Sequence, residues 1–522
     1  MYSDVAIPSG NLAEYVMRDW SKFGDKIALK SSETGQTQSF NQLNDYVHRL
    51  ASSLTKMGIQ KGDVVFLLSP NLPEYATIYL ATVLIGAIVT TNNPAYTPSE
   101  VSKAIALSGA KLVFASPDNL TTVAQALHLL EGKHRVQETI VIGEMVGYRP
   151  LSSLLSGEEY QRDLLDLDYT SHVAALPFSS GTTGLPKGVM LTHTNILSNL
   201  LQLHNSDMSV SYDDVLSGIL PFFHIYGQVT TLLLGLSVGA TTVTMRKFDF
   251  VGFLEMIQKE NITLSHLVPP IILGLSKSDL TKKYDLESLQ IVTVGAAPLK
   301  IDQSLEFAQK FSKVHLLQGY GLTETSPAVT FNSPRRLKHG SAGMLLPNVK
   351  AKVVDLDSGK SLPVNTEGEL YFHGPNIMKG YWRDEEATLD CLDGDWFRTG
   401  DIGYYDEEGF FHVVDRLKEL IKYKGFQVAP AELEALLLAH HKILDSAVVS
   451  VPCNEAGELP RAYIVAKPGQ SVSDEEIHTY MKEKASNHKQ LRGGIRMIDA
   501  IPKSASGKIL RRVLKDQALK DI

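Results

Sequence analysis

The sequence predicts an α/β protein in which a large N-terminal domain of α/β subdomains, with a small β-barrel-like subdomain, is hinged to a small α+β C-terminal lid domain. Three observations lead to this prediction. Helix-like and strand-like segments alternate from about residue 11, short strands broken by Gly, Asp and Asn follow from about residue 344 to 414, and residues 417–522 carry elements of their own. Such alternation is typical of parallel sheets covered on both faces, and short interrupted strands are typical of a small antiparallel unit.

The first elements show the alternation clearly. Residues 39–58 place apolar side chains at Leu43, Val47, Leu50 and Leu54, which is the spacing of one helical face. The following segments are predicted, in order, as a strand (63–70), a helix opened by proline (73–87), a strand (88–91), a helix (98–110) and a strand (111–116).

The remaining elements divide at a polar break over residues 415–418. Short strands are predicted before it at 348–355, 368–374, 380–382 and 409–415. After it we predict a helix (431–440), strands (446–451 and 461–469), a helix opened by a capping box from Ser473 to Glu476, and a strand (495–499). The predicted domains are therefore residues 1–416 and 417–522.

Composition excludes several classes of protein. Of the 522 residues, 43% are hydrophobic and 21% are charged, as in an ordinary globular chain rather than a disordered or collagen-like one. The net charge of -8 argues against binding along nucleic acid. This charge is divided unevenly, with -12 on residues 1–416 and +4 on residues 417–522, which suits a cationic lid over anionic ligands. Chance variation on solvated surfaces explains the division equally well.

The sequence shows no cysteine-based metal site or disulfide framework and no apolar stretch long enough to span a membrane. Cys391 and Cys453 are far apart and offer neither a metal-ligand spacing nor a disulfide framework, so we expect two free thiols. The apolar stretches at 76–91 and 229–245 are too short to span a bilayer, and no secretion signal or peroxisomal tripeptide is visible. We expect a cytoplasmic protein without an integral membrane segment, as a monomer or a weak homo-oligomer.

The segment from Ser179 to Gly188, SSGTTGLPKG, carries the clearest chemical signal. Its glycines permit close approach of the backbone to a ligand, its hydroxyl and N–H groups suit phosphate oxygens, and Lys187 supplies positive charge. The spacing differs from the G-x-x-x-x-G-K-[ST] phosphate loop, which disfavours a standard P-loop enzyme. Composition alone fits a flexible turn equally well.

The whole string and further motifs resemble the adenylate-forming superfamily. The motifs occur in family order at PFFHIYG (221–227), GAAPL (295–299), QGYGLTETSP (318–327), the long segment 396–434 and PKSASGKILRR (502–512). Among its members, the chain is most similar to 4-coumarate–CoA ligases and related acyl-CoA synthetases. The resemblance implies an acid–thiol ligase that uses ATP, Mg²⁺ and CoA: a carboxylate attacks the α-phosphorus of ATP, and the CoA thiol then displaces AMP from the acyl-adenylate.

The resemblance also implies the nucleotide site. Glu324 corresponds to a Mg²⁺ ligand, Thr323 reaches the α-phosphate, and Asp401 accepts both ribose hydroxyls. Out of this context, Glu324 reads as a solvated loop acid and Asp401 as a turn residue. The other expected contacts to ATP or AMP are Ser179, Ser180, Gly181, Thr182, Thr183, Lys187, Gln318, Arg416 and the hinge residue Lys418.

The resemblance also implies that the C-terminal domain moves between the two steps of the reaction. Lys508, in the small-residue loop Ser504–Lys508, is expected to orient the carboxylate and the α-phosphate during adenylation. A rotation of the C-terminal domain at residues 416–418 would then withdraw it and make room for CoA. The residues expected to serve the second step are Lys422 and Gln427 in the site, and Lys247, Lys424 and Gly425 at CoA.

The acyl pocket is also assigned by resemblance. His224 corresponds to the residue that gates the carboxylate, although a satisfied core histidine is the plainer interpretation. Tyr226 resembles the residue that bonds a phenolic hydroxyl. The remaining pocket positions are Thr230, Ala296, Gly319, Pro327 and Ala328. Thr230 and Ala328 depart from the plant pattern, so a medium-chain or another aryl acid fits as well as a hydroxycinnamate.

Three other functions compete with a carboxylate–CoA ligase. One is an adenylating enzyme that loads a carrier protein, which the absence of a carrier domain after Lys508 and the CoA-like KYKGF segment disfavour. Another is a luciferase-like monooxygenase. The last is a catalytically silent nucleotide-binding scaffold, which the full set of charged motif residues disfavours.

Overall fold

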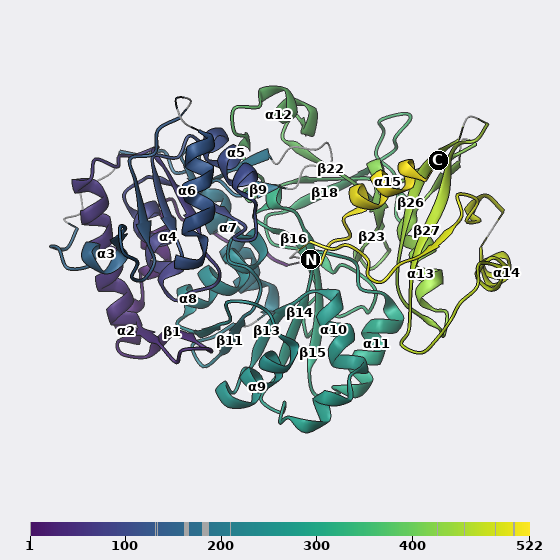
Figure 1. The fold of residues 1–522 in the computed structure, drawn as a ribbon, viewed down its shortest axis with the longest axis horizontal. Helices are drawn as coiled ribbons and strands as arrows, with labels where there is room; N and C mark the ends of the chain where they lie inside the picture. The colour runs from purple at the N-terminus through teal and green to yellow at the C-terminus, as the bar shows by residue number, and fades with distance from the viewer. Residues whose placement is uncertain are drawn as a thin grey trace. The chain divides into compact units, whose positions relative to one another are not determined.

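The structure, a computed structural model, describes residues 2–130, 132, 134–160, 166–179, 187–208, 210–424, 426–453, 455–485, 487–504 and 507–521. The chain forms two compact units (Figure 1). The first unit comprises Met1–Lys338, Gly343–Lys350 and His373–Phe397, and the second comprises His339–Ala342, Ala351–Phe372 and Arg398–Ile522. The predicted mixed α/β class is confirmed. The division between residues 416 and 417 stays a prediction.

One sheet of the first unit has the strand order β17-β16-β15-β14-β13-β11-β12-β1-β2. Strands β1, β12, β11, β13, β14 and β15 are parallel, and β2, β16 and β17 extend the edges in antiparallel pairing. The bounds are β1 (Ile27–Ser31), β2 (Thr37–Ser39), β11 (Val215–Gly218), β12 (Thr241–Thr244), β13 (Leu264–Leu267), β14 (Ile291–Val294), β15 (His315–Gly321), β16 (Ala328–Phe331) and β17 (Met344–Leu345).

A second sheet of the first unit has the order β20-β10-β8-β4-β3-β5-β6-β7, with β9 paired to β10. Its central strands are parallel, and β10 runs antiparallel to β8, β9 and β20. The bounds are β3 (Val64–Leu68), β4 (Ile88–Asn92), β5 (Leu112–Ala115), β6 (Glu138–Val141), β7 (Arg149–Pro150), β8 (Val173–Ala175), β9 (Phe178–Ser179), β10 (Lys187–Thr192) and β20 (Gly380–Tyr381).

The three helices predicted for the first unit, at 39–58, 73–87 and 98–110, are present as α3, α4 and α5. Helix α3 begins at the capping box of Ser39 and Gln42 and buries Leu43, Val47 and Leu50, as its apolar spacing predicts. Helix α4 is buried along nearly its whole length. The bounds are α1 (Leu12–Met17), α2 (Trp20–Phe23), α3 (Phe40–Lys56), α4 (Glu74–Leu84), α5 (Pro98–Ser108), α6 (Leu120–Leu129), α7 (His193–Leu203), α8 (Leu234–Val238), α9 (Phe250–Glu260), α10 (Pro269–Lys277), α11 (Ile301–Lys310) and α12 (Glu385–Cys391). Shorter turns are η1 (Pro117–Asn119), η2 (Leu151–Leu154), η3 (His204–Met208), η4 (Gly227–Leu233), η5 (Asp279–Lys283) and η6 (Thr323–Thr325), of which η3 and η4 are π-helical.

The second unit contains most of the predicted short strands and the C-terminal elements, whereas the predicted strand at 380–382 is β20 of the first unit. Strands β18 (Lys350–Val354), β19 (Gly368–His373) and β22 (Trp396–Tyr405) are neighbours in one sheet, and β23 (Phe411–Arg416) pairs with β22. Strand β21 (Leu392–Asp393) pairs with Trp396 and Phe397 at the start of β22, all within residues of the first unit. The other sheet has the order β25-β24-β27-β26, with β28 beside β27. Its bounds are β24 (Ile421–Tyr423), β25 (Phe426–Val428), β26 (Ile443–Cys453), β27 (Gly457–Ala466) and β28 (Ile495–Met497), and the helical segments are η7 (Leu417–Glu419), α13 (Pro430–Leu438), α14 (Asp474–Lys484), η8 (Asn487–Lys489) and α15 (Arg511–Lys520).

Helices cover both faces of this C-terminal sheet. Successive side chains of a strand point to opposite faces. Val448 of β26 accordingly packs with α13 and α14, whereas Ala447 and Val449 pack with Leu514 of α15. Both hydrophobic clusters lie within the second unit, so the region after residue 417 has a core of its own.

Two details of the C-terminal elements differ from the prediction. The hairpin β26–β27 extends over 443–453 and 457–466, because continued pairing satisfies more backbone groups than the predicted core strands alone. The capping box is only half formed: the Ser473 hydroxyl accepts from the Glu476 N–H at 3.2 Å, but the Glu476 carboxylate accepts from Lys442 Nζ at 2.9 Å. A salt bridge thus takes the carboxylate that would complete the box.

The search for membrane-spanning segments over the described residues found no helix with the length and apolar character needed to cross a bilayer.

Candidate functional site

The predicted phosphate loop lies on the β9–β10 hairpin of the first unit. Ser179 ends β9, Lys187 begins β10, and the two residues are directly paired across the hairpin. The strands therefore hold a hydroxyl and an ammonium side by side at the base of the loop. Ser180, Gly181, Thr182 and Thr183, which were assigned to the same loop, lie outside the described residues.

Lys187 faces an aromatic ring and a carboxylate. Its Nζ lies 5.0 Å from the centre of the Tyr381 ring and 4.0 Å from Asp384 Oδ2. Asp384 is fixed because it caps α12, where its side chain accepts from the Ala387 N–H. The ammonium is partly exposed and remains accessible to an anionic ligand.

Glu324 lies in η6 and is buried, with only 7% of its surface exposed. The backbone around it is fixed, because Met378 N–H donates to the Glu324 carbonyl at 2.8 Å and Asn376 Nδ2 donates to the Thr325 carbonyl at 2.9 Å. The Tyr381 hydroxyl donates to Glu324 Oε1 at 2.9 Å. Tyr381 thereby connects the metal-ligand candidate with Lys187.

Tyr381 is a site residue that sequence reasoning missed. Residues 380–382 were interpreted only as a short strand, and β20 does contain Tyr381. Burial and the neighbouring Glu324 carboxylate raise the pKa of Tyr381 far above its usual value, so the phenol remains a hydrogen-bond donor at neutral pH. The sequence signal that could have identified it is a lone tyrosine in a Gly-Tyr-Trp strand, which is weak without the structure.

The donor set around Glu324 fits Mg²⁺ and not a metal held by protein ligands alone. Over the described parts of the chain, no three His, Cys, Asp or Glu side chains gather into a metal-binding group. Magnesium is commonly bound through one or two carboxylates, with substrate phosphates and water completing its shell. A single oriented carboxylate beside a phosphate loop matches that requirement.

Thr323 and two of the pocket residues, Ala296 and Gly319, lie near the carboxyl ends of the parallel strands β14 and β15. Gln318 and Gly319 belong to the last part of β15, and Ala296 follows β14 directly with a φ of 68°. Ligands of open α/β sheets bind outside these strand ends. A Cβ at Gly319 would lie 2.5 Å from the Phe331 ring, so this strand position requires a glycine to admit its neighbour.

Tyr226 takes part in a buried polar chain. Its hydroxyl is 2.9 Å from Thr293 Oγ1, which is also 2.6 Å from His266 Nδ1, and the Tyr226 ring packs against Gly295. Burial lowers the pKa of His266 to about 3, so this imidazole is neutral. Thr293 and His266 were not predicted, because nothing in the sequence pattern connects them with Tyr226.

The other predicted pocket residues lie close to Tyr226 in sequence or on β16. His224 Nδ1 accepts from the Tyr226 N–H at 3.3 Å, and Thr230 Oγ1 donates to the Tyr226 carbonyl at 2.7 Å. Ala328 is held at both its N–H and its carbonyl by the Asn199 amide, next to Pro327. Lys247, by contrast, is exposed in the segment between β12 and α9.

In the second unit, Asp401 and Arg416 are brought together. They are paired across β22 and β23, and Arg416 Nε lies 3.2 Å from Asp401 Oδ1. Asp401 is 3% exposed, and its N–H donates to Thr399 Oγ1 at 3.0 Å. The predicted ribose carboxylate and its predicted basic neighbour therefore form one rigid pair.

The hinge and CoA residues are mostly exposed. Lys418 lies in η7, Lys422 lies in β24, and both side chains are exposed. Lys424 is exposed at the hairpin turn with a φ of 47°, and its N–H donates to the Ala456 carbonyl. Gly425 lies outside the described residues, and nothing is described of the Gln427 side chain, although Gln427 pairs with Lys422.

Lys508 is bonded to Ser504, four residues before it, and Ala505 and Ser506 between them lie outside the described residues. The Ser504 N–H donates to the Lys508 carbonyl at 2.8 Å, and the Lys508 N–H donates to Ser504 Oγ at 3.1 Å. Lys503 and Ile509 pair outside these bonds as an isolated bridge. The loop is therefore closed by backbone bonds at its base.

Two family models match the chain. The model of the AMP-binding enzyme matches residues 16–382, and the model of the AMP-binding enzyme C-terminal domain matches residues 432–508. Together they span both units.

Relatives match over nearly the full length. The chain is 39% identical to 4-coumarate–CoA ligase 5 of Oryza sativa subsp. japonica over 98% of this chain and 95% of that relative. It is 41% identical to 4-coumarate–CoA ligase 2 of Petroselinum crispum with the same coverage of each. Among solved structures, ATP-bound MatB from Rhodopseudomonas palustris is 30% identical with a TM-score of 0.87, covering 97% of this chain and 98% of that one.

The environment of Cys391 gives a test of the site's electrostatics. Burial and the Glu324 carboxylate raise the pKa of Cys391 to about 12, because both disfavour the thiolate. We expect Cys391 in the native protein to be alkylated by iodoacetamide at pH 8.5 at least about tenfold more slowly than free cysteine in the same buffer, because the thiolate is the reactive form. Mass spectrometry of the labelled peptide measures this rate.

The control for the thiol measurement is the same peptide in the denatured chain, which should react at the rate of free cysteine. A native Cys391 that reacts as quickly as free cysteine would contradict the described environment of Glu324.

Proposed function

The chain belongs to the AMP-binding enzyme family, and from this premise we propose that it is an ATP-dependent carboxylate–CoA ligase that forms an acyl-adenylate and then an acyl-CoA thioester. The observation that carries the proposal is identity of about 40% to 4-coumarate–CoA ligases over nearly the whole of both chains. A match that includes the C-terminal domain supports a complete ligase reaction better than nucleotide binding alone.

The first step requires cations, because a carboxylate must approach a polyphosphate. Lys187 would neutralise the β- and γ-phosphates from the start of β10, where strand pairing and the Tyr381 ring limit its movement. Bound Mg²⁺ would offset phosphate charge and polarise the phosphoryl oxygens. Glu324 would hold the ion, and Tyr381 would keep the carboxylate oriented through its hydroxyl. Thr323, adjacent to Glu324 in η6, would contact the α-phosphate.

The ribose would be bound in the second unit. The buried Asp401 carboxylate would accept both ribose hydroxyls, and its salt bridge to Arg416 would hold it in position. Gln318 would contact the nucleotide from β15 in the first unit.

The second step, transfer of the acyl group to CoA, requires that Lys508 leave the reacting centre and that other residues replace it. Lys508 would orient the carboxylate and the α-phosphate during adenylation and then withdraw by rotation at residues 416–418. Lys422 would take its place, with Lys247, Lys424 and Gly425 contacting CoA. The short helical turn η7 with the exposed Lys418 is a segment short enough to absorb such a rotation.

We further propose an aryl acid, with a hydroxycinnamic acid as the first candidate and a medium-chain fatty acid as the alternative. His224 would face the carboxylate, and Tyr226, Thr230, Ala296, Gly319, Pro327 and Ala328 would line the pocket. The Tyr226 hydroxyl is bonded to Thr293, and a hydroxyl can donate one bond while it accepts another. It therefore retains the capacity to bond a phenolic substrate. The cytoplasmic location and the oligomeric state stay predictions.

Incubation with ATP, Mg²⁺, CoA and a panel of carboxylic acids tests the proposed function. The expected result is pyrophosphate release with AMP and an acyl-CoA thioester, greatest for an aryl or medium-chain acid. Adenylate without thioester would support a carrier-loading enzyme, and oxygen consumption or light would support a luciferase-like enzyme. Absence of pyrophosphate release with every acid would contradict the proposal.

Substitution of Lys508 by alanine tests the division of labour between the two steps. We expect adenylate formation to fall by about 100-fold or more, because a positioned cation is lost at the reacting phosphorus. Thioester formation from a supplied acyl-adenylate should change by less than about twofold, because Lys508 has left the site by then. Pyrophosphate release and single-turnover thioester formation measure the two rates. Equal losses in both would refute the assigned role.

Substitution of Tyr226 by phenylalanine tests the phenolic-acid proposal. We expect the kcat/KM ratio for 4-hydroxycinnamate over cinnamate to fall by about tenfold or more, since a buried substrate hydroxyl would lose a partner. Tyr212→Phe is the matched control because Tyr212 is an exposed tyrosine. An unchanged ratio in Tyr226→Phe would remove hydroxycinnamates from the candidate substrates.

A further inference from the structure

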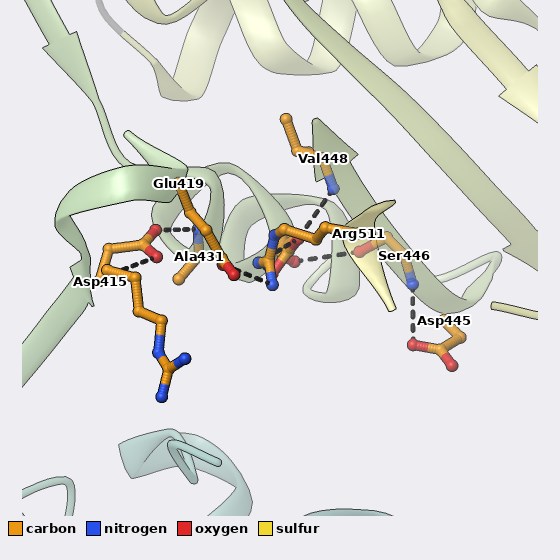
Figure 2. Close-up of polar contacts among 9 residues, drawn as sticks. Asp415, Glu419, Ala431, Asp445, Ser446, Val448 and Arg511 are labelled. Atoms are coloured by element: carbon orange, nitrogen blue, oxygen red, sulfur yellow. Dashed lines mark hydrogen bonds and ion pairs between the residues drawn. The ribbon is translucent and has the colours of Figure 1, made fainter. Parts of the chain in front are cut away.

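A buried charge cluster in the second unit surrounds Arg511, the first residue of α15. Arg511 Nη2 donates to both oxygens of Glu434 at 2.7 and 2.8 Å, and Arg511 Nη1 lies 3.1 Å from Glu419 Oε2. The guanidinium thus has carboxylate partners in both Glu419 and Glu434, and Figure 2 shows the Glu419 carboxylate directed at Arg511. One side chain therefore connects three segments: η7, α13 and the beginning of α15.

The bonds of Glu434 extend the cluster into the sheet. Glu434 Oε1 also accepts from the Val448 N–H at 2.8 Å, and Ser446 Oγ donates to the Glu434 carbonyl at 3.3 Å (Figure 2). The side chain of Glu434 is 9% exposed and that of Arg511 is 13% exposed. A planar guanidinium with two carboxylate partners fixes orientation more strictly than a single ammonium could.

Arg511 lies close in the chain to Lys508, the lysine assigned to adenylation. Arg511 follows Lys508 by three residues, and Leu510 between them is tied back to the Pro502 carbonyl at 2.9 Å. On the other side of the loop, Lys503 Nζ lies 2.6 Å from Asp445 Oδ2 of β26. Both ends of the Lys508 loop are therefore anchored by ion pairs, one to the sheet and the other to η7 and α13.

The contact with Glu419 connects the loop to the predicted hinge. Glu419 is the last residue of η7, which contains Lys418, and Asp415 lies just before the hinge. Asp415 accepts from the N–H groups of Arg416 and Ala431 at 2.7 and 2.8 Å (Figure 2). Arg511 thus holds Glu419, directly after the hinge, to Glu434 of α13, and Asp415, directly before the hinge, is bonded to the beginning of the same helix.

We propose that Arg511 is a positioning residue for Lys508: by binding Glu419 and Glu434 together, it joins the segment of Lys508, the residue directly after the hinge (Glu419) and α13 into one rigid piece that turns as a unit at residues 416–418. Lys508 then reaches the reacting centre at a fixed orientation relative to the hinge. The inference rests on the proposed function, since it assigns a role within the adenylation step.

The cluster tolerates loss of the arginine better than an isolated buried ion pair would. Burial raises the pKa of Glu434 to about 7, so this carboxyl can take up a proton near neutral pH. Without Arg511, Glu434 can take up a proton instead of remaining as an uncompensated buried charge. A variant at Arg511 is therefore expected to fold and to show its effect on the position of the loop.

Arg511→Gln tests the proposal through the two half-reactions. We expect adenylate formation to fall by about 10- to 100-fold, because a displacement of about 1 Å at a reacting group has an effect of this size. Thioester formation from a supplied acyl-adenylate should change by less than about twofold, because Lys508 takes no part in it. A general structural role would slow both half-reactions together.

A double substitution shows whether the effect passes through Lys508. If Arg511 acts only by placing Lys508, then Arg511→Gln combined with Lys508→Ala should form adenylate no more slowly than Lys508→Ala alone. Arg511→Lys should recover part of the adenylation rate, since an ammonium keeps the charge but not the paired contacts. Arg512→Gln, which removes the same charge from an exposed neighbour, is the matched control and should change each rate by less than about twofold.

Equal losses in both half-reactions, or additive losses in the double variant, would overturn the positioning role. If Arg511→Gln does not fold, Glu419→Gln removes the hinge contact alone, and it should slow adenylation selectively by about three- to tenfold. An unchanged rate in that variant would overturn the proposal. A wild-type protein that releases no pyrophosphate overturns the proposed function itself, whereas an active wild type with an unimpaired Arg511→Gln variant overturns only the inference about Arg511.

Discussion

Repulsion between two anions is the constraint on which the proposed mechanism depends. A carboxylate cannot approach the α-phosphorus of a polyphosphate unless cations are held in a fixed geometry around it. The cation that serves this step would also obstruct the thiol that follows. The chain offers a fixed cation and a cation that can withdraw. Lys187 is held by strand pairing in the first unit, and Lys508 lies near the C-terminus in the second unit, where its N–H is bonded to Ser504. Residues that orient these groups matter as much as the cations themselves.

Tyr381 and Arg511 illustrate two ways of providing that orientation. Tyr381 donates to Glu324 while its ring lies beside Lys187, so one aromatic side chain restrains a carboxylate and an ammonium. Arg511 restrains a loop, because it joins the start of α15 to η7 and α13. In both cases a partly buried side chain with more than one partner fixes a group that must meet a ligand. Such support is required because small displacements at a reacting centre have large effects on rate.

Local sequence patterns predicted much of the fold, but they did not predict the contacts by which Tyr381 and Arg511 orient other residues. The apolar spacing of residues 39–58 predicted α3, and the alternation of short apolar runs predicted β3, β4 and β5 with their intervening helices. These features follow from periodicity within a few turns of the chain. The hydrogen bond from Tyr381 to Glu324 joins residues 57 positions apart, and that from Arg511 to Glu434 joins residues 77 apart. No local pattern contains such pairs, so they became visible only with the tertiary structure.

The central claim is that the reaction proceeds through an acyl-adenylate made before CoA is used. Chemical quenching of a single turnover with ATP, Mg²⁺ and the best acid of the panel, first without CoA and then with it, tests this claim directly. The proposed mechanism predicts acyl-adenylate and pyrophosphate in amounts up to the amount of enzyme before CoA is added, and AMP with acyl-CoA afterwards. Formation of ADP and inorganic phosphate, or of thioester without prior adenylate, would contradict it.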